Sequence, residues 1–100
     1  MNNEKYINKK VIIRGEASGV FYGTLASRSG REVELINCRR LWYWDGAATL
    51  SQLALDGTSR PDSCKFTVTV PEICILDAIE VIPCTERASA SIEGVSEWKR

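Results

Sequence analysis

The strongest constraint on the fold lies between residues 11 and 44, where three β-type segments follow one another with only short turns between them. These segments are residues 11–14, residues 20–27 and residues 32–44, the last of which is long enough to contain a bend. Glycine-containing turns, one of them the tight Ser29-Gly30-Arg31 connection, favour antiparallel neighbours. The pattern therefore predicts a three-stranded antiparallel meander.

The pattern changes after residue 44 to the spacing of a short helix. Leu50, Leu53 and Ala54 stand at i, i+3 and i+4, so residues 47–55 are expected to be helical. Asp45 is the expected cap at the start of this helix, and Gly57 is the expected stop.

The last third of the chain predicts two further strands and a second helix. Residues 65–70 alternate with Phe66, Val68 and Val70 on the inner face, and Pro71 is expected to end that strand. The second strand is expected over residues 78–82. Thr85 is the expected cap of a helix that runs to Glu93 and stops at Gly94.

With 100 residues, the chain is expected to form one domain over residues 1–100. The predicted class is mostly β (α+β), with a five-stranded curved sheet or barrel. A short helix is inserted after the third strand, and a short helix lies near the C-terminus. A curved sheet or a barrel lets a short chain bury one face of its strands.

Charge and histidine content exclude several functions. Thirteen basic and thirteen acidic side chains balance, so no global field attracts bulk DNA or an anionic membrane. The sequence has no histidine, which excludes Ser-His-Asp and Cys-His catalysis and every histidine-ligated metal. We therefore predict no catalytic residue, no metal, no cofactor and no enzymatic activity, although spacing cannot exclude an acid pair formed across the fold.

The cysteines and the apolar runs predict a cytoplasmic protein. Cys38, Cys64, Cys74 and Cys84 form no CxxC pair, so we expect free and mostly buried thiols. No apolar run approaches the roughly 18 residues of a membrane span. Residues 1–10 are polar and charged, unlike a secretory signal.

The one unusual segment is residues 37–45, which combine an arginine pair with three aromatic side chains. Guanidinium groups bind phosphate and aromatic rings stack on nucleobases, so this composition favours a nucleotide ligand. The alternative is that the tryptophans are core or interface anchors and the arginines a solvated edge. The predicted ligand-binding residues are Arg39, Arg40, Trp42, Trp44, Phe21, Tyr22, Asn37 and Arg14.

Residues 11–35 resemble the first half of an Sm-like fold, in which a strand, a glycine-containing strand and a hairpin follow one another. This resemblance covers about a quarter of the chain and implies a ring-forming RNA-binding protein.

A second resemblance covers most of the chain and is carried by four segments. They are residues 39–47 (RRLWYWDGA), 50–54 (LSQLA), 64–68 (CKFTV) and 82–86 (IPCTE). These segments resemble a family of small phage and prophage proteins close to the phage Thoeris anti-defence sponges. Such sponges sequester a cyclic ADP-ribose immune signal without cleaving it.

The second resemblance implies a viral protein in the host cytoplasm, with a small anionic nucleotide as its ligand and with itself as a partner, in a dimer or hexamer. Excess aromatic residues for one small core also favour a homo-oligomer. An enzyme that degrades the same signal is a further alternative.

Overall fold

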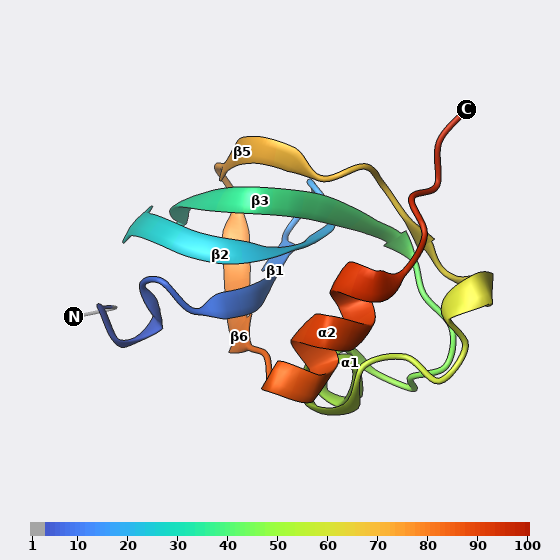
Figure 1. Ribbon diagram of the computed structural model, residues 1–100. Coiled ribbons are helices and arrows are strands. Elements are labelled where there is room, and N and C mark those ends of the chain that lie inside the picture. The colour runs from blue at the N-terminus through green and yellow to red at the C-terminus, as the bar shows by residue number, and fades with distance from the viewer. Residues whose placement is uncertain (1–3) are drawn as a thin grey trace.

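The computed structural model describes residues 4–100. This part of the chain contains six strands, two α-helices and two short 3-10 turns (Figure 1). The strands are β1 (Lys10–Gly15), β2 (Val20–Ser29), β3 (Glu32–Tyr43), β4 (Lys65–Phe66), β5 (Val70–Ile75) and β6 (Ala78–Pro83). The helices are α1 (Leu50–Asp56) and α2 (Glu86–Gly94), and the 3-10 turns are η1 (Glu4–Tyr6) and η2 (Pro61–Ser63). The predicted mostly β (α+β) class is confirmed, with one helix after the third strand and one near the C-terminus. The expectation that residues 1–10 are no secretory signal falls partly on residues 1–3, outside the described residues.

The sheet is an open antiparallel sheet that curls strongly. β1, β2 and β3 form the predicted meander, β6 pairs with β1, and β4 and β5 both pair with β3. Only Leu76 and Asp77 separate β5 from β6 in the sequence, yet these strands lie toward opposite edges of the sheet. A connection this short spans only about 10 Å. The sheet therefore bends until its two edges approach one another.

A β-bulge bends β3 in its middle. Tyr22 pairs with Arg39 and Thr24 pairs with Ile36, so Gly23 alone faces two residues of β3. One of the two is Asn37, whose φ is +50°. A Cβ atom on Gly23 would lie 3.1 Å from the carbonyl oxygen of Ile36, so the close approach favours glycine here. The bulge supplies the bend that the length of this segment suggested.

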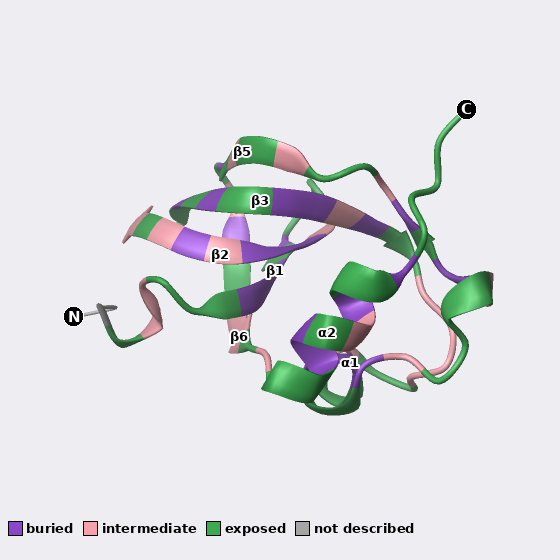
Figure 2. Ribbon diagram, viewed as in Figure 1, coloured by how far each residue is buried: buried purple, intermediate pink, exposed green. Residues whose placement is uncertain are grey.

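Buried side chains form two clusters on the two faces of the sheet. Figure 2 shows the buried positions along the strands and along α2. The first cluster, inside the curl, consists of Val11, Ile13, Phe21, Leu25, Val33, Leu35, Cys38, Ile75 and Ala78. The second cluster, between the sheet and the helices, consists of Ile12, Tyr22, Leu41, Leu53, Ala54, Cys64, Phe66, Ile92 and Val95. β1 contributes to both clusters, so its three central residues are completely buried.

The two helices begin at threonine caps. The Oγ1 of Thr85 accepts from the backbone N–H of Ala88 at 3.0 Å, as predicted for α2. The prediction of Asp45 as the cap of α1 is wrong, because the Oγ1 of Thr49 accepts from the N–H of Gln52 at 3.1 Å instead. α1 consequently starts at Leu50, a turn later than expected, and ends at the predicted Gly57.

The predicted strand over residues 65–70 is wrong in its extent. β4 has only two residues, Val68 is 36% exposed, and Pro71 lies inside β5 rather than after a strand. β5 is an edge strand whose inner side pairs with β3 through the neighbours of Pro71, namely Val70 and Glu72. Proline is tolerated at such an edge because its missing N–H points away from the sheet. The separation of β4 from β5 gives six strands instead of the predicted five.

Among residues 4–100, no helix has the length and apolar character needed to cross a membrane.

Candidate functional site

The two arginines of the predicted phosphate site point to opposite faces of β3. Arg39 shares its face with Leu41, in the second cluster, whereas the guanidinium of Arg40 lies 4.4 Å from the ring centroid of Phe21, in the first cluster. This follows from the alternation of side chains along a strand. The structure therefore separates the pair: Arg39 is buried inside the protein, and Arg40 lines a cavity.

Arg39 is a buried structural residue with only 3% of its surface exposed. Its guanidinium donates to four backbone carbonyl oxygens: Thr67 at 2.9 Å, Phe66 at 3.1 Å, Ile92 at 2.9 Å and Val95 at 2.9 Å. Burial lowers the pKa of Arg39. Four of its five N–H groups are used inside the protein, where the side chain joins the segment at β4 to the end of α2, and the residue also lines a cavity of about 300 Å³.

Arg40 lies in a cavity of about 490 Å³, here called the Arg40 cavity. Its lining consists of Ala17, Ser18, Phe21, Arg40, Ile73, Cys74, Ile75, Leu76 and Asp77. One guanidinium nitrogen, Nη1, donates to the carbonyl oxygen of Ser18 at 2.7 Å. Among residues 4–100 the guanidinium forms no ion pair, so its remaining N–H groups are available to an anion. A fixed guanidinium over a mostly apolar lining is suited to a small organic anion.

The β1–β2 loop forms one wall of the Arg40 cavity and is held in place by Asp77. The carboxylate of Asp77 accepts from the Ser18 hydroxyl, from the N–H of Ala17 at 2.7 Å and from the N–H of Ser18 at 3.0 Å. These hydrogen bonds, that of the Ser18 hydroxyl first, lower the pKa of Asp77. Because Ser18 also accepts from Arg40, the loop, the carboxylate and the guanidinium are positioned together.

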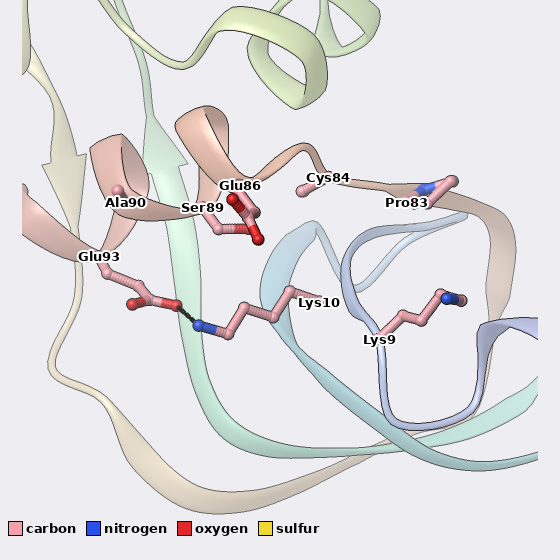
Figure 3. A pocket seen from close by; sticks show the side chains of 8 residues that line it. All are labelled: Lys9, Lys10, Pro83, Cys84, Glu86, Ser89, Ala90 and Glu93. Carbon is pink, nitrogen blue, oxygen red and sulfur yellow. Dashed lines mark ion pairs between the residues drawn. The ribbon is translucent and has the colours of Figure 1, made fainter.

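A second cavity, of about 410 Å³, lies between the start of β1 and α2 (Figure 3). The ion pair between Lys10 and Glu93, 2.8 Å long, joins these two elements. A neighbouring polar cavity of about 300 Å³ shares both residues and also contains Asn37, which is exposed. Lys10 is paired with Glu93 here, whereas the Arg40 guanidinium forms no ion pair among residues 4–100, although Asp77 also lines its cavity.

Tyr22 is not an exposed stacking surface. It is 2% exposed, and its hydroxyl donates to Oε2 of Glu93 at 2.5 Å. Burial first, and then this hydrogen bond, raise the pKa of Tyr22. Burial alone would raise the pKa of Glu93, but hydrogen bonds from Lys10 and Tyr22 lower it below its ordinary value. Tyr22 thus belongs to the packing of α2 on the sheet.

The remaining predicted residues are spread over the molecule. Arg14 is exposed, and its Nε donates to Glu80 at 2.8 Å. Trp44 is partly buried against the second cluster, whereas Trp42 is 63% exposed. Phe21 is buried and forms one wall of the Arg40 cavity. Of the eight predicted residues, the structure brings Arg40 and Phe21 together at the Arg40 cavity, and Tyr22, Asn37 and Arg39 together at the cavity of about 300 Å³.

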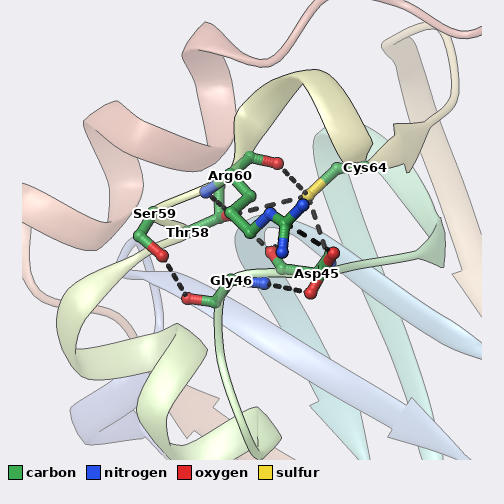
Figure 4. Close-up of polar contacts among 6 residues, drawn as sticks. All are labelled: Asp45, Gly46, Thr58, Ser59, Arg60 and Cys64. Atoms are coloured by element: carbon green, nitrogen blue, oxygen red, sulfur yellow. Dashed lines mark hydrogen bonds and ion pairs between the residues drawn. The ribbon is translucent and has the colours of Figure 1, made fainter.

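The ends of the segment between β3 and β4 are tied together by a polar cluster (Figure 4). The Thr58 hydroxyl donates to the carbonyl oxygen of Asp45, and the N–H of Ser59 donates to the carbonyl oxygen of Gly46 at 3.2 Å. The thiol of Cys64 lies 3.5 Å from the Asp45 carbonyl oxygen and 3.6 Å from that of Arg60. Because the same sulfur also accepts from the N–H of Asp45 at 3.5 Å, Cys64 adds contacts that hold the two ends of the loop together.

The other cysteines are also free thiols. Cys38 is buried, Cys84 is half-buried and Cys74 is exposed. Burial raises the pKa of Cys38 and of Cys84 to about 12 each. Both thiols are therefore protonated at neutral pH, which does not suit a nucleophile.

The sequence does not indicate four of the residues that define these cavities. Ser18, Asp77, Lys10 and Glu93 come from segments far from residues 37–45, and no motif marks them. Glycine in the β1–β2 turn was the one available signal, since it indicated a loop beside the strands. Only the three-dimensional pairing of β1 with β2 and β6 shows that this loop meets Asp77.

These features define a small α+β domain with a curled antiparallel sheet, two helices on one face and an arginine-containing cavity at the other. The chain belongs to the family described as "Domain of unknown function (DUF6948)", whose model matches residues 8–92. No curated protein matches the chain.

Proposed function

We propose that this protein binds a small anionic nucleotide in the Arg40 cavity and holds it without chemical change. One observation carries the proposal: the Arg40 guanidinium is fixed by Phe21 and Ser18 but forms no ion pair with the described residues. An arginine that is already positioned before binding loses little conformational freedom when it binds a phosphate.

The biological role that we propose follows from the resemblance to phage Thoeris anti-defence sponges. The protein would be encoded by a phage, act in the host cytoplasm as a homo-oligomer, and sequester a cyclic ADP-ribose or cyclic nucleotide immune signal. A sponge needs no nucleophile, general base or metal, so this role is compatible with a sequence that lacks histidine.

A retention experiment tests this proposal. The protein is incubated with cyclic ADP-ribose, cyclic AMP or cyclic di-AMP, separated from free ligand and denatured by heat, and the released molecule is analysed. Recovery of an intact nucleotide supports the proposal. Recovery of an altered nucleotide identifies a degrading enzyme, and retention of none of the three overturns the proposal.

The matched variants are Arg40→Ala and Arg87→Ala. Loss of the Arg40 guanidinium should weaken binding roughly 100-fold, as expected when two charge-assisted hydrogen bonds are lost. Arg87 pairs with Asp56 on the helices and does not line the Arg40 cavity, so its variant should bind like the wild type. Equal affinity of Arg40→Ala and wild type would show that the anion binds elsewhere.

The Sm-like alternative has its own signature. A ring-forming RNA-binding protein would retain single-stranded RNA with an affinity that falls steeply with salt. Such retention, without retention of the cyclic nucleotides, would replace the proposal by this alternative.

A further inference from the structure

Two tryptophans from distant parts of the chain stack on the surface at the end of β3. The ring centroids of Trp42 and Trp98 lie 6.1 Å apart, and the ring planes differ by 18°. The ammonium group of Lys65 lies 5.4 Å from the centroid of Trp98. Trp42 is nevertheless 63% exposed, so a large part of its indole remains open to solvent. We call Trp42, Trp98 and Lys65 the tryptophan stack.

Backbone pairing fixes the tryptophan stack in place. The N–H of Trp98 donates to the carbonyl oxygen of Phe66 at 2.8 Å, and Glu97 forms a parallel bridge with Phe66. Leu41 pairs with Phe66, and both side chains lie in the second cluster. Their sequence neighbours Trp42 and Lys65 therefore point to the opposite face. The exposed indole is thus held in a defined position before any ligand arrives.

The tryptophan stack and the Arg40 cavity lie on the same face of the sheet. Arg40 and Trp42 are alternate residues of β3, so their Cα atoms are about 7 Å apart. The guanidinium of Arg40 reaches from β3 over Phe21 of β2, whereas the indole of Trp42 stacks on Trp98 beside β4. A nucleotide that contacts both groups would therefore lie across β3.

We propose that Trp42 is the stacking surface for the base of the nucleotide whose phosphate is bound by Arg40, an inference that rests on the function proposed above. Trp98 stacks on one face of the Trp42 indole and leaves the other face for a base, and Lys65 adds positive charge next to Trp98. A preordered indole with an open face gains stacking energy with little loss of side-chain entropy. The arrangement selects a ligand with both a phosphate and a planar base.

The test compares the wild type with Trp42→Ala and Trp42→Tyr by calorimetric titration. The probes are the three cyclic nucleotides of the retention experiment and inorganic pyrophosphate, which has phosphate groups but no base. Trp42→Ala should bind the retained nucleotide about 10- to 100-fold more weakly, which is the range for loss of one stacked base. Its affinity for pyrophosphate should not change, and Trp42→Tyr should restore most of the nucleotide affinity.

Three outcomes would overturn the inference without overturning the proposed function. Wild-type affinity of Trp42→Ala, together with loss of binding in Arg40→Ala, would reject the base site and leave the proposed function intact. An equal loss of nucleotide and pyrophosphate affinity would show that Trp42 affects the cavity as a whole. A fall in the solution mass of Trp42→Ala would show that a second copy covers the indole. If no nucleotide binds to the wild type, the proposed function fails together with the inference.

Discussion

Replacing Arg39 by alanine removes four hydrogen bonds at once. The carbonyl oxygens of Thr67 and Val95 lose this donor, whereas that of Phe66 keeps the N–H of Trp98 and that of Ile92 keeps the N–H of Val95. A hydrogen bond to a charged group contributes about 1.5–3 kcal/mol, but the four are not additive, because burying the guanidinium itself costs free energy. Breaking such a buried network costs roughly 3–5 kcal/mol. We therefore expect Arg39→Ala to lose about 4 kcal/mol of unfolding free energy, a large share of the roughly 5–15 kcal/mol of a typical domain.

Urea unfolding followed by circular dichroism measures this loss. With a slope of about 2 kcal/mol per molar urea, the midpoint should fall by roughly 2 M. Arg39→Lys keeps the charge but not the planar fork, so its loss should be intermediate. Arg87→Ala is the control, because that side chain is 72% exposed and an exposed ion pair contributes about 1 kcal/mol or less. A loss below about 1 kcal/mol in Arg39→Ala, at an unchanged slope, would refute a structural role for Arg39.

Two further predictions concern the loops. Hydrogen bonds lower the pKa of Asp77 in the folded state, so its contribution to stability is present above its ordinary pKa and is lost as pH falls through the folded-state pKa. The stability difference between wild type and Asp77→Asn should therefore stay constant from neutral pH down to the ordinary pKa of 3.8 and shrink below it in urea titrations, and a difference that does not shrink there would contradict this linkage. Gly46 has φ of +87°, and a Cβ there would lie 2.5 Å from the backbone nitrogen of Arg60. Gly46→Ala should lose at least about 2 kcal/mol of unfolding free energy, from strain and from the clash. Gly94→Ala, where a Cβ meets nothing, should change stability little, and equal losses in the two glycine variants would refute the argument.

The meander was predictable because its signals are local. Residues 11–44 alternate strand patterns with glycine turns, and the tight connection at Gly30 appears as expected, with φ of +59°. The start of α1 was not predictable, because Asp45 and Thr49 are both good caps. In the structure the Asp45 carboxylate accepts from the N–H of Gly46 and pairs with Arg60, which comes from a different segment. Local propensity could not rank the two candidates.

The candidate site could be predicted only in part, for a similar reason. Side chains alternate along an extended strand, so Arg39 and Arg40 must point to opposite faces, but this rule does not show which of the two is covered. That depends on α2 and the residues after it, which supply carbonyl oxygens to Arg39 alone. Trp44 departs from the simple alternation and packs with Leu41 against the second cluster, because the pairing of β3 with β4 shifts register between Leu41 and Tyr43.

The bonds of Arg39 also set an order of events during synthesis. Arg39 precedes Ile92 by 53 positions and Val95 by 56, so the ribosome completes the meander long before these acceptors exist. Until then, Arg39 has only the carbonyl oxygens of Phe66 and Thr67, two of its four acceptors, so closing the second cluster would bury a charge with incomplete hydrogen bonding, which is unfavourable. We therefore expect the second cluster to close only after the turn that follows α2 has been translated.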